Sequence, residues 1–257
     1  MSVFDEFNRT LPKLPIHENL RLAFNQYLAW KREKQKAKVV LSKLVNTWKS
    51  SRIMAEGLKK ALLDYQSRHQ AIVRSLGYEV FEATLTTRSR LVVGLGNPNP
   101  SENGLTFHHV YGFPIIPGSA QKGLCAHYAK EIEDKTEADS VYQEVFGTKN
   151  QKGKVIFLDA FPLLVEDTLP EGLLELDIMN PHYQKYYSSK GGIPPADYLS
   201  PNPILFVAVG PGVPFHFTLM ALRNHKALLE VARSWLKSAL EIMGIGGKTQ
   251  VGYGRLS

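Results

Sequence analysis

Residues 81–90 read FEATLTTRSR, and they mark the point where the hydrophobic period of the chain changes from about 3.6 residues to 2. The odd positions begin as Phe, Ala and Leu and alternate with polar side chains, which is typical of a strand buried on one face only. Arg88 and Arg90 fall on the polar face near the end of this strand. We therefore expect both arginines to be available to an anionic ligand.

The sequence before this strand, residues 16–76, has a helical pattern of apolar residues. Three stripes carry the pattern: Leu20, Phe24, Tyr27 and Leu28; Leu41, Leu44, Val45 and Trp48; and Leu58, Leu62, Tyr65, His69, Ile72 and Leu76. We expect two or three helices here, with His69 packed and hydrogen-bonded rather than acting as a ligand. Residues 1–76 are thus predicted to be a basic helical extension packed on a core of residues 77–257.

The sequence after residue 90 alternates between strands and helices. The predicted elements are a helix from Ala120 to Glu133 with Ser119 as its N-cap, a buried strand at 155–158, a short strand at 173–179, a hairpin of strands 204–209 and 215–220, a helix ending near Met243, and a short strand around Val251. This order fits an α+β fold with a ferredoxin-like β-α-β-β-α-β core and insertions at about 94–113 and 163–203.

The chain ends in a glycine-rich segment, residues 244–255, which reads GIGGKTQVGYGR. Glycine allows positive φ angles and close approach of main-chain N–H groups to a ligand, whereas a helix stop needs only one glycine. Lys248 and Thr249 add a cation and a hydroxyl of the kind that phosphates attract, so we expect ligand contact here. At the helix start near Ser119, Lys122 opposes the helix dipole unless an anion docks on the N-terminal amides.

The positive charge is concentrated in the first third of the chain. The formal net charge is +7, from 31 Lys and Arg against 24 Asp and Glu; residues 1–75 hold 15 of the basic and 6 of the acidic residues, which leaves 16 and 18 for the rest. This asymmetry favours a polyanionic partner such as nucleic acid. The segment from Lys31 to Lys38 has five basic residues around one acid, and it either follows a phosphate backbone or faces water.

The composition argues against several classes of protein. No run of 18 apolar residues predicts a membrane span, and the first residues lack the pattern of a secretory signal, so we expect a cytoplasmic protein without a membrane partner. The single cysteine, Cys125, excludes an internal disulfide framework and a Cys-rich zinc site. Asp159, Asp177, His127 and His182 show no metal-ligand spacing, so we expect no metal and no cofactor.

Two short matches to catalytic motifs fail on their context. Gly247-Lys248-Thr249 resembles the end of a phosphate-binding P-loop, but Ile242 stands where the first glycine is required and only eight residues follow Thr249. Ser119 and Lys122 match the S-x-x-K signature of acyl-serine enzymes, but the companion K-T-G and S-D-N motifs are missing. We therefore expect neither nucleotide hydrolysis nor acyl-serine chemistry.

The predicted helix start and the glycine-rich end together resemble motifs of the RAMP superfamily of CRISPR-associated proteins. Residues 116–123 read IPGSAQKG, and the family typically has an I-P-G-S-x-x-K-G helix start and a closing G-x-G-rich loop. Residues 90–96, 107–113 and 153–160 are also similar to the family of sixth subunits of type III-B (Cmr) effector complexes. The resemblance covers the sequence from about residue 78 onward.

This resemblance implies a ferredoxin-like, RNA-recognition-type fold and a place in a filament of RAMP subunits along a guide RNA, near the guide's 3′ end. The implied partners are guide RNA, target RNA and other RAMP subunits. The implied RNA contacts are Ser119, Lys122, Gly246, Gly247, Lys248, Thr249 and Gln250, to which the strand pattern adds Arg88 and Arg90. The RNA-cutting subunit of the family uses an aspartate after its first strand, whereas residues 94–112 contain Asn97, Asn99 and Glu102 but no Asp. A non-catalytic subunit is therefore implied.

Two other interpretations stay open from the sequence. The first is a stand-alone endoribonuclease of the RAMP type that processes guide-RNA precursors, with His108 or His109 as candidate catalytic residues. The second is a protein-only scaffold whose positive charge is incidental.

Overall fold

The computed structural model describes residues 19–22, 37–99, 103–181 and 203–257, together with five single positions between 186 and 194. Two features predicted from the sequence fall largely outside these residues. The basic segment from Lys31 to Lys38 lies outside them up to Ala37, where a helix begins. Most of the segment from Pro181 to Pro203 lies outside them as well.

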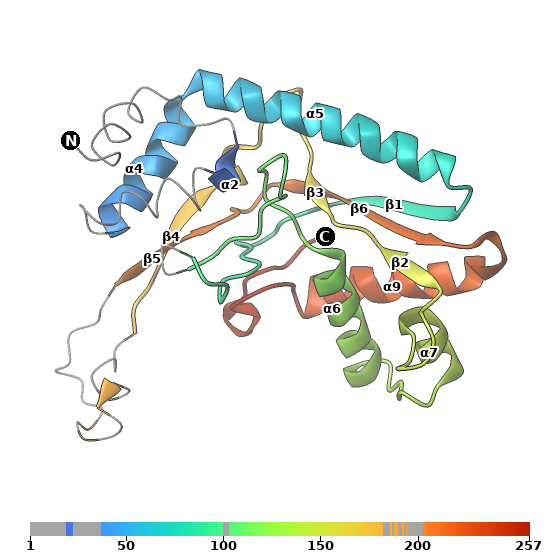
Figure 1. Cartoon of the computed structure of the whole chain (residues 1–257). Helices are drawn as coiled ribbons and strands as arrows, with labels where there is room; N and C mark the ends of the chain where they lie inside the picture. The colour runs from blue at the N-terminus through green and yellow to red at the C-terminus, as the bar shows by residue number, and fades with distance from the viewer. Residues whose placement is uncertain are drawn as a thin grey trace, which may run out of the picture.

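A four-stranded antiparallel sheet lies at the centre of the described structure (Figure 1). Its strands are β1 (Glu79–Thr86), β2 (Val155–Phe157), β3 (Phe161–Pro162) and β6 (Pro214–Ala221). β6 is the central strand, because it pairs with β1 along its whole length and also with β2 and β3. A second, two-stranded antiparallel sheet is formed by β4 (Glu175–Met179) and β5 (Ile204–Ala208).

Helices cover both faces of the central sheet (Figure 1). The described helices are α2 (Leu20–Leu22), α4 (Ala37–Ser50), α5 (Arg52–Ser75), α6 (Gly118–Glu131), α7 (Ser140–Phe146) and α9 (Lys226–Ile242), with 3-10 turns η3 (Glu171–Leu173), η4 (Arg223–His225) and η5 (Thr249–Val251). Phe81 of β1 stands on the α9 face, where the guanidinium of Arg233 lies 4.9 Å from its ring centre. Thr218 of β6 stands on the opposite face, where its hydroxyl lies 3.0 Å from Nε2 of His69 on α5.

One hydrophobic core links these layers. It includes Leu41 of α4, Leu58 of α5, Phe217 of β6 and Leu236 of α9, each at most 2% exposed. Burial of a leucine or phenylalanine side chain contributes roughly 1.5–3 kcal/mol, so this core outweighs any single polar contact in the molecule. The helices before β1 therefore bury their apolar stripes in the same core as the sheet.

Several predictions from the periodicity of the sequence are confirmed. The mixed α+β class is present, and the odd positions of β1 are more buried than the even positions up to Thr84, as predicted. The strand ends at Thr86, so Arg88 and Arg90 lie beyond it and not near its end on its polar face. His69 is 8% exposed and hydrogen-bonded to Thr218, which confirms it as a packed histidine. The β-α-β-β-α-β order of a ferredoxin-like core stays a prediction.

The predicted hairpin of residues 204–209 and 215–220 is wrong. Both segments are strands, but β5 pairs with β4 in the smaller sheet, whereas β6 belongs to the central sheet. The short connection between them turns at Gly212, whose φ is +82°, and carries the chain from one sheet to the other. Both edges of β6 are occupied by β1, β2 and β3, so no edge remains for β5.

The buried face at the end of α5 and the predicted last strand also differ from the prediction. The third apolar stripe continues through Val73, which is 5% exposed, whereas Ile72 and Leu76 are 58% and 49% exposed. Val73 therefore faces the sheet at this end of α5, whereas Ile72 does not. The strand predicted around Val251 is wrong, because residues 249–251 form a 3-10 turn bounded by left-handed residues at positions 248 and 252.

Candidate nucleic-acid interface

The N-terminal half of α6, the end of α9 and the glycine-rich segment enclose an open groove of about 600 Å³. The lining residues are Ala120, Gly123, Leu124, His127, Ile242, Met243, Gly244, Ile245, Gly246, Thr249, Gln250 and Arg255. The groove is part polar, with a hydroxyl, an amide, an imidazole and a guanidinium among its lining groups. The two segments that carry the sequence motifs therefore meet in one hollow.

Backbone packing explains the glycines of the C-terminal segment. A Cβ at Gly254 would lie 2.0 Å from the carbonyl oxygen of Ile245, and a Cβ at Gly246 would lie 2.3 Å from that of Val92. The amides of Ile245 and Gly247 donate to the carbonyls of Gly254 and Val92, at 2.9 and 2.7 Å. The N–H of Gly247 fixes the loop against the chain that follows β1, and the N–H of Ile245 closes the glycine-rich segment on itself. Neither of these two N–H groups is available to a ligand, contrary to the expectation from the sequence.

Lys248 is held by aromatic rings. Its backbone is left-handed, with φ of 62°, and its ammonium lies 5.1 Å from the ring centre of Phe206 and 5.2 Å from that of Tyr253. Cation–π contacts of this kind stabilise by about 0.5–2 kcal/mol. Lys248 is therefore anchored toward β5, and it is not among the residues that line the groove.

Arg90 belongs to the same anchored network. Its Nε lies 3.3 Å from Oε2 of Glu175 and 3.5 Å from Oδ2 of Asp177 on β4. The hydroxyl of Tyr253 donates to Oδ2 of Asp177. Burial, followed by this hydrogen bond, raises the pKa of Tyr253 to about 12, which keeps the phenol protonated as a donor. The network ties the glycine-rich segment to the smaller sheet.

The start of α6 differs from the prediction in its cap. The N-cap residue is Pro117 without a side-chain cap, and Ser119 lies exposed in the first turn, so the predicted serine cap is wrong. The carboxylate of Asp159 accepts a 2.8 Å hydrogen bond from the amide of Gly118. The carboxylate of Asp159, which is remote in sequence, therefore occupies one of the helix N-terminal amides that were expected to bind an external anion.

Gln121 joins α6 to the strand segment behind it. It is fully buried, and its Nε2 donates to the carbonyls of Ile116 and Leu158 at 2.9 and 2.8 Å. A Cβ at Gly118 would lie 2.1 Å from the carbonyl oxygen of Phe157, so the helix start packs directly on the end of β2. The I-P-G-S-x-x-K-G motif is thus explained in part by packing.

Only some of the nine predicted contact residues line the groove. Gly246, Thr249 and Gln250 line it, whereas Ser119 and Lys122 lie near the start of α6 and are not among the lining residues. Gly247 bonds to Val92 in the chain that follows β1, and Lys248 and Arg90 contact residues of the smaller sheet. Arg88 forms a 3.6 Å ion pair with Glu241 of α9, and both side chains are more than half exposed.

Two groove residues with polar or charged side chains were not predicted as contacts. His127 lines the groove with residues 120, 123 and 124, which are spaced as one face of a helix, so helical periodicity counted from the motif could have found it. Arg255 also lines the groove, and its guanidinium donates to the carbonyl of Glu241 at 3.4 Å. Its approach to the groove depends on the turn at residues 249–252, which the sequence alone did not indicate.

His108 has a packing role in the loop after β1. Its Nδ1 accepts hydrogen bonds from the amides of Val110 and Tyr111 at 3.2 and 3.1 Å, and its ring centre lies 4.9 Å from that of Tyr65. Burial lowers the pKa of His108, although the nearby Asp159 opposes this shift. His109, the other candidate catalytic residue, is exposed.

In the part of the chain that the structure describes, no helix is long and apolar enough to span a bilayer.

Comparisons with known proteins match the same region. The RAMP superfamily model matches residues 84–257. The CRISPR system Cmr subunit Cmr6 of Pyrococcus furiosus is 34% identical over 66% of this chain and 65% of its own length. That of Saccharolobus solfataricus is 31% identical over 74% of this chain and 61% of its own length. The chain thus spans less than two thirds of each of these relatives.

The described fold is shared with a chain of a solved assembly, the type III-B Cmr-beta complex bound to cognate target RNA. The superposition has a TM-score of 0.63 and covers 99% of this chain and 86% of the other, at 24% sequence identity. At this level of identity the likeness establishes a common fold.

Proposed function

Because the chain belongs to the RAMP superfamily, we propose that it is a guide-RNA-binding subunit of a type III-B CRISPR effector complex that targets RNA. The names of its relatives support this assignment, since both are Cmr6 subunits of a CRISPR system. The proposed partners are guide RNA, target RNA and other RAMP subunits. The proposed position is near the 3′ end of the guide, in the cytoplasm.

The groove between α6 and the glycine-rich segment is the observation that carries the proposal. The polar groups of Thr249 and Gln250 line the groove together with His127 of α6, and Arg255 adds a guanidinium. Such groups contact phosphate and ribose and fix the register of a strand without reading its bases. This mode suits a protein that accepts a guide of any sequence.

We assign two cations to the RNA backbone: Lys122, which the sequence predicted, and Arg255, which the sequence did not predict and which lines the groove. Lys248 and Arg90 are held by aromatic rings and carboxylates, so we assign them to the support of the loop. Arg88 is paired with Glu241 in an exposed ion pair, which is worth about 0–1 kcal/mol and is easily exchanged for a phosphate. We therefore place Arg88 at the rim of the interface.

We further propose that the subunit does not cut RNA. The loop of residues 94–112 has no aspartate, and His108 uses its Nδ1 to accept two backbone amides. A general base needs a free lone pair within hydrogen-bond reach of the proton that it abstracts. This arrangement disfavours the endoribonuclease interpretation, in which His108 would be catalytic.

Binding of single-stranded RNA at several salt concentrations tests the proposal. Each phosphate that is neutralised on a single strand contributes about −0.7 to the slope of log K against log salt, so Lys122→Ala and Arg255→Ala should each weaken binding and flatten the slope by about that amount. Lys60→Ala is the matched control, because Lys60 is an exposed cation on α5, on the opposite face of the sheet. Equal slopes for all three variants would remove the groove from the interface.

Two further measurements test the finer proposals. Photo-crosslinking of guides that carry a reactive nucleotide at successive positions, in the assembled complex, should give the strongest adduct near the 3′ end. Incubation of the protein with labelled precursor RNA should give no discrete products. Products that appear with the wild type and disappear with His108→Gln or His109→Gln would favour the endoribonuclease instead.

A further inference from the structure

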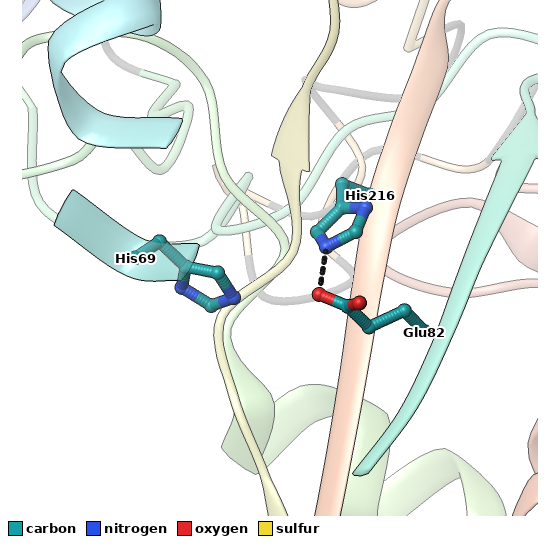
Figure 2. A group of neighbouring side chains, drawn as sticks. All are labelled: His69, Glu82 and His216. Atoms are coloured by element: carbon teal, nitrogen blue, oxygen red, sulfur yellow. Dashed lines mark hydrogen bonds and ion pairs between the residues drawn. The ribbon is translucent and has the colours of Figure 1, made fainter. Parts of the chain in front are cut away.

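Three side chains from distant parts of the sequence meet between α5 and the central sheet. Figure 2 shows His69 of α5, Glu82 of β1 and His216 of β6, whose ligand-type atoms all lie within 4.8 Å of one another. Nε2 of His216 lies 3.1 Å from Oε1 of Glu82. The ring centres of the two histidines are 5.8 Å apart, and their planes are nearly perpendicular.

The register of the sheet explains why these residues meet. In the β1–β6 pair Glu82 is opposite Thr218 and Thr84 is opposite His216, so Glu82 and His216 are diagonal neighbours on one face. Long side chains reach one another across such a diagonal. The same face is covered by α5, whose buried stripe brings Nε2 of His69 to 3.0 Å from the hydroxyl of Thr218.

We propose that His69, Glu82 and His216 form a binding site for a transition-metal dication of the Zn²⁺ type. Two imidazoles and one carboxylate, with a fourth position open, are a donor set that zinc accepts in tetrahedral geometry. With metal–ligand bonds of about 2.0–2.1 Å the edges of such a tetrahedron are about 3.3–3.4 Å, and the His216–Glu82 separation is already close to this value. The widest separation must shorten by about 1.5 Å at most, which rotation of the side chains provides.

The surroundings combine a rigid interior with one accessible side. His69 is 8% exposed, and the side chains of His216 and Glu82 are 14% and 46% exposed. The ring of Phe161 packs on both histidines, with centre distances of 5.2 Å to His69 and 5.1 Å to His216. The two imidazoles therefore share one aromatic neighbour, whereas the carboxylate of Glu82 lies where an ion can enter from solvent. A bound ion would fasten α5 to the two longest strands of the sheet.

The rival account is a hydrogen-bonded cluster without an ion. In that account Glu82 pairs only with His216, and His69 is bonded only to Thr218. The cluster then contributes the same stability whether or not zinc is present. The two accounts differ in every measurement that varies the metal, and neither depends on RNA binding.

Zinc titration of the full chain, without an affinity tag and after treatment with EDTA followed by dialysis, tests the proposal. Competition against a chromophoric chelator should give one Zn²⁺ per chain, and Co²⁺ should give the intense visible absorption of a tetrahedral site. Glu82→Gln and His216→Gln should each lower the affinity by at least about tenfold, since removal of a ligand costs more than the 10- to 100-fold lost with outer-shell partners. His109→Gln is the matched control, because His109 is exposed and outside the cluster.

Thermal unfolding provides a second measurement. The Tm of the wild type and of His109→Gln should rise with Zn²⁺ concentration, whereas the Tm of Glu82→Gln should not, because a ligand of the native state stabilises that state alone. Glu82→Gln removes a partly exposed charge, so its Tm in EDTA should stay near that of the wild type. The proposal is overturned if the wild type retains no zinc, or if Glu82→Gln binds zinc as tightly as His109→Gln.

Discussion

Replacement of Gln121 by leucine tests whether the hydrogen bonds of this side chain hold the start of α6 to the sheet. Gln121 is fully buried, and its amide nitrogen is the donor for the carbonyls of Ile116 and Leu158. Leucine is similar in size but donates nothing, so the carbonyl of Leu158 loses its side-chain donor, whereas the carbonyl of Ile116 keeps its 2.9 Å hydrogen bond from the amide of Ala160. Each buried acceptor that is left unpaired costs about 1–3 kcal/mol. The side-chain oxygen Oε1 has no partner among the described residues, and its removal offsets part of this cost.

We therefore expect Gln121→Leu to lower the free energy of unfolding by about 1–3 kcal/mol. Equilibrium unfolding in urea, followed by circular dichroism, measures this change from the midpoint and slope of the transition. The matched control is Gly123→Ala on the same helix, where an added Cβ meets nothing within 4 Å, and which should be stabilising by about 0.5–1 kcal/mol. A loss below about 0.5 kcal/mol for Gln121→Leu would refute this reasoning, because the carbonyl of Leu158 would then lose its side-chain donor at almost no cost.

Two further predictions concern the glycine-rich segment and the loop after β1. Gly246→Ala should lower the free energy of unfolding, measured in urea, by more than Gly212→Ala. Both glycines have positive φ, but only a Cβ at Gly246 meets a backbone oxygen, that of Val92 at 2.3 Å. Equal losses in the two variants would contradict the close approach. Burial holds the pKa of His108 below its ordinary value of 6.5, so the unfolded chain binds a proton more readily and His108 destabilises the fold as pH falls through 6.5. The stability difference between the wild type and His108→Gln should therefore shrink between pH 7.5 and pH 5, and a constant difference would contradict this reading.

Local periodicity was enough to predict the elements that are amphipathic on their own. Residues 81–85 alternate between apolar and polar side chains and lie in β1, and the stripe of α9 from Leu228 to Leu240 is buried as its spacing requires. The pairing of β5 was not predictable in this way. Its apolar pattern fits either sheet, and the choice depends on β4 and on the occupied edges of β6, which are remote in sequence.

The candidate groove was predicted only as two separate motifs. Sequence spacing identified Gly246, Thr249 and Gln250, but it assigned Lys248 to the ligand, whereas the rings of Phe206 and Tyr253 hold that side chain. The cap at the start of α6 was missed because Asp159 reaches it from beyond β2. Tertiary contacts decide which polar group in a motif remains free, and a single sequence does not contain them.

The central position of β6 has a consequence for synthesis of the protein on the ribosome. β1 emerges early, but its pairing partner is separated from it by most of the chain, as the pair Glu79 and Ala221 shows. No strand of the larger sheet can find its neighbour until β6 has left the exit tunnel. The nascent polypeptide must therefore shield the apolar faces of α4, α5 and α6 for most of translation, a requirement that chaperones meet for folds with such remote pairings.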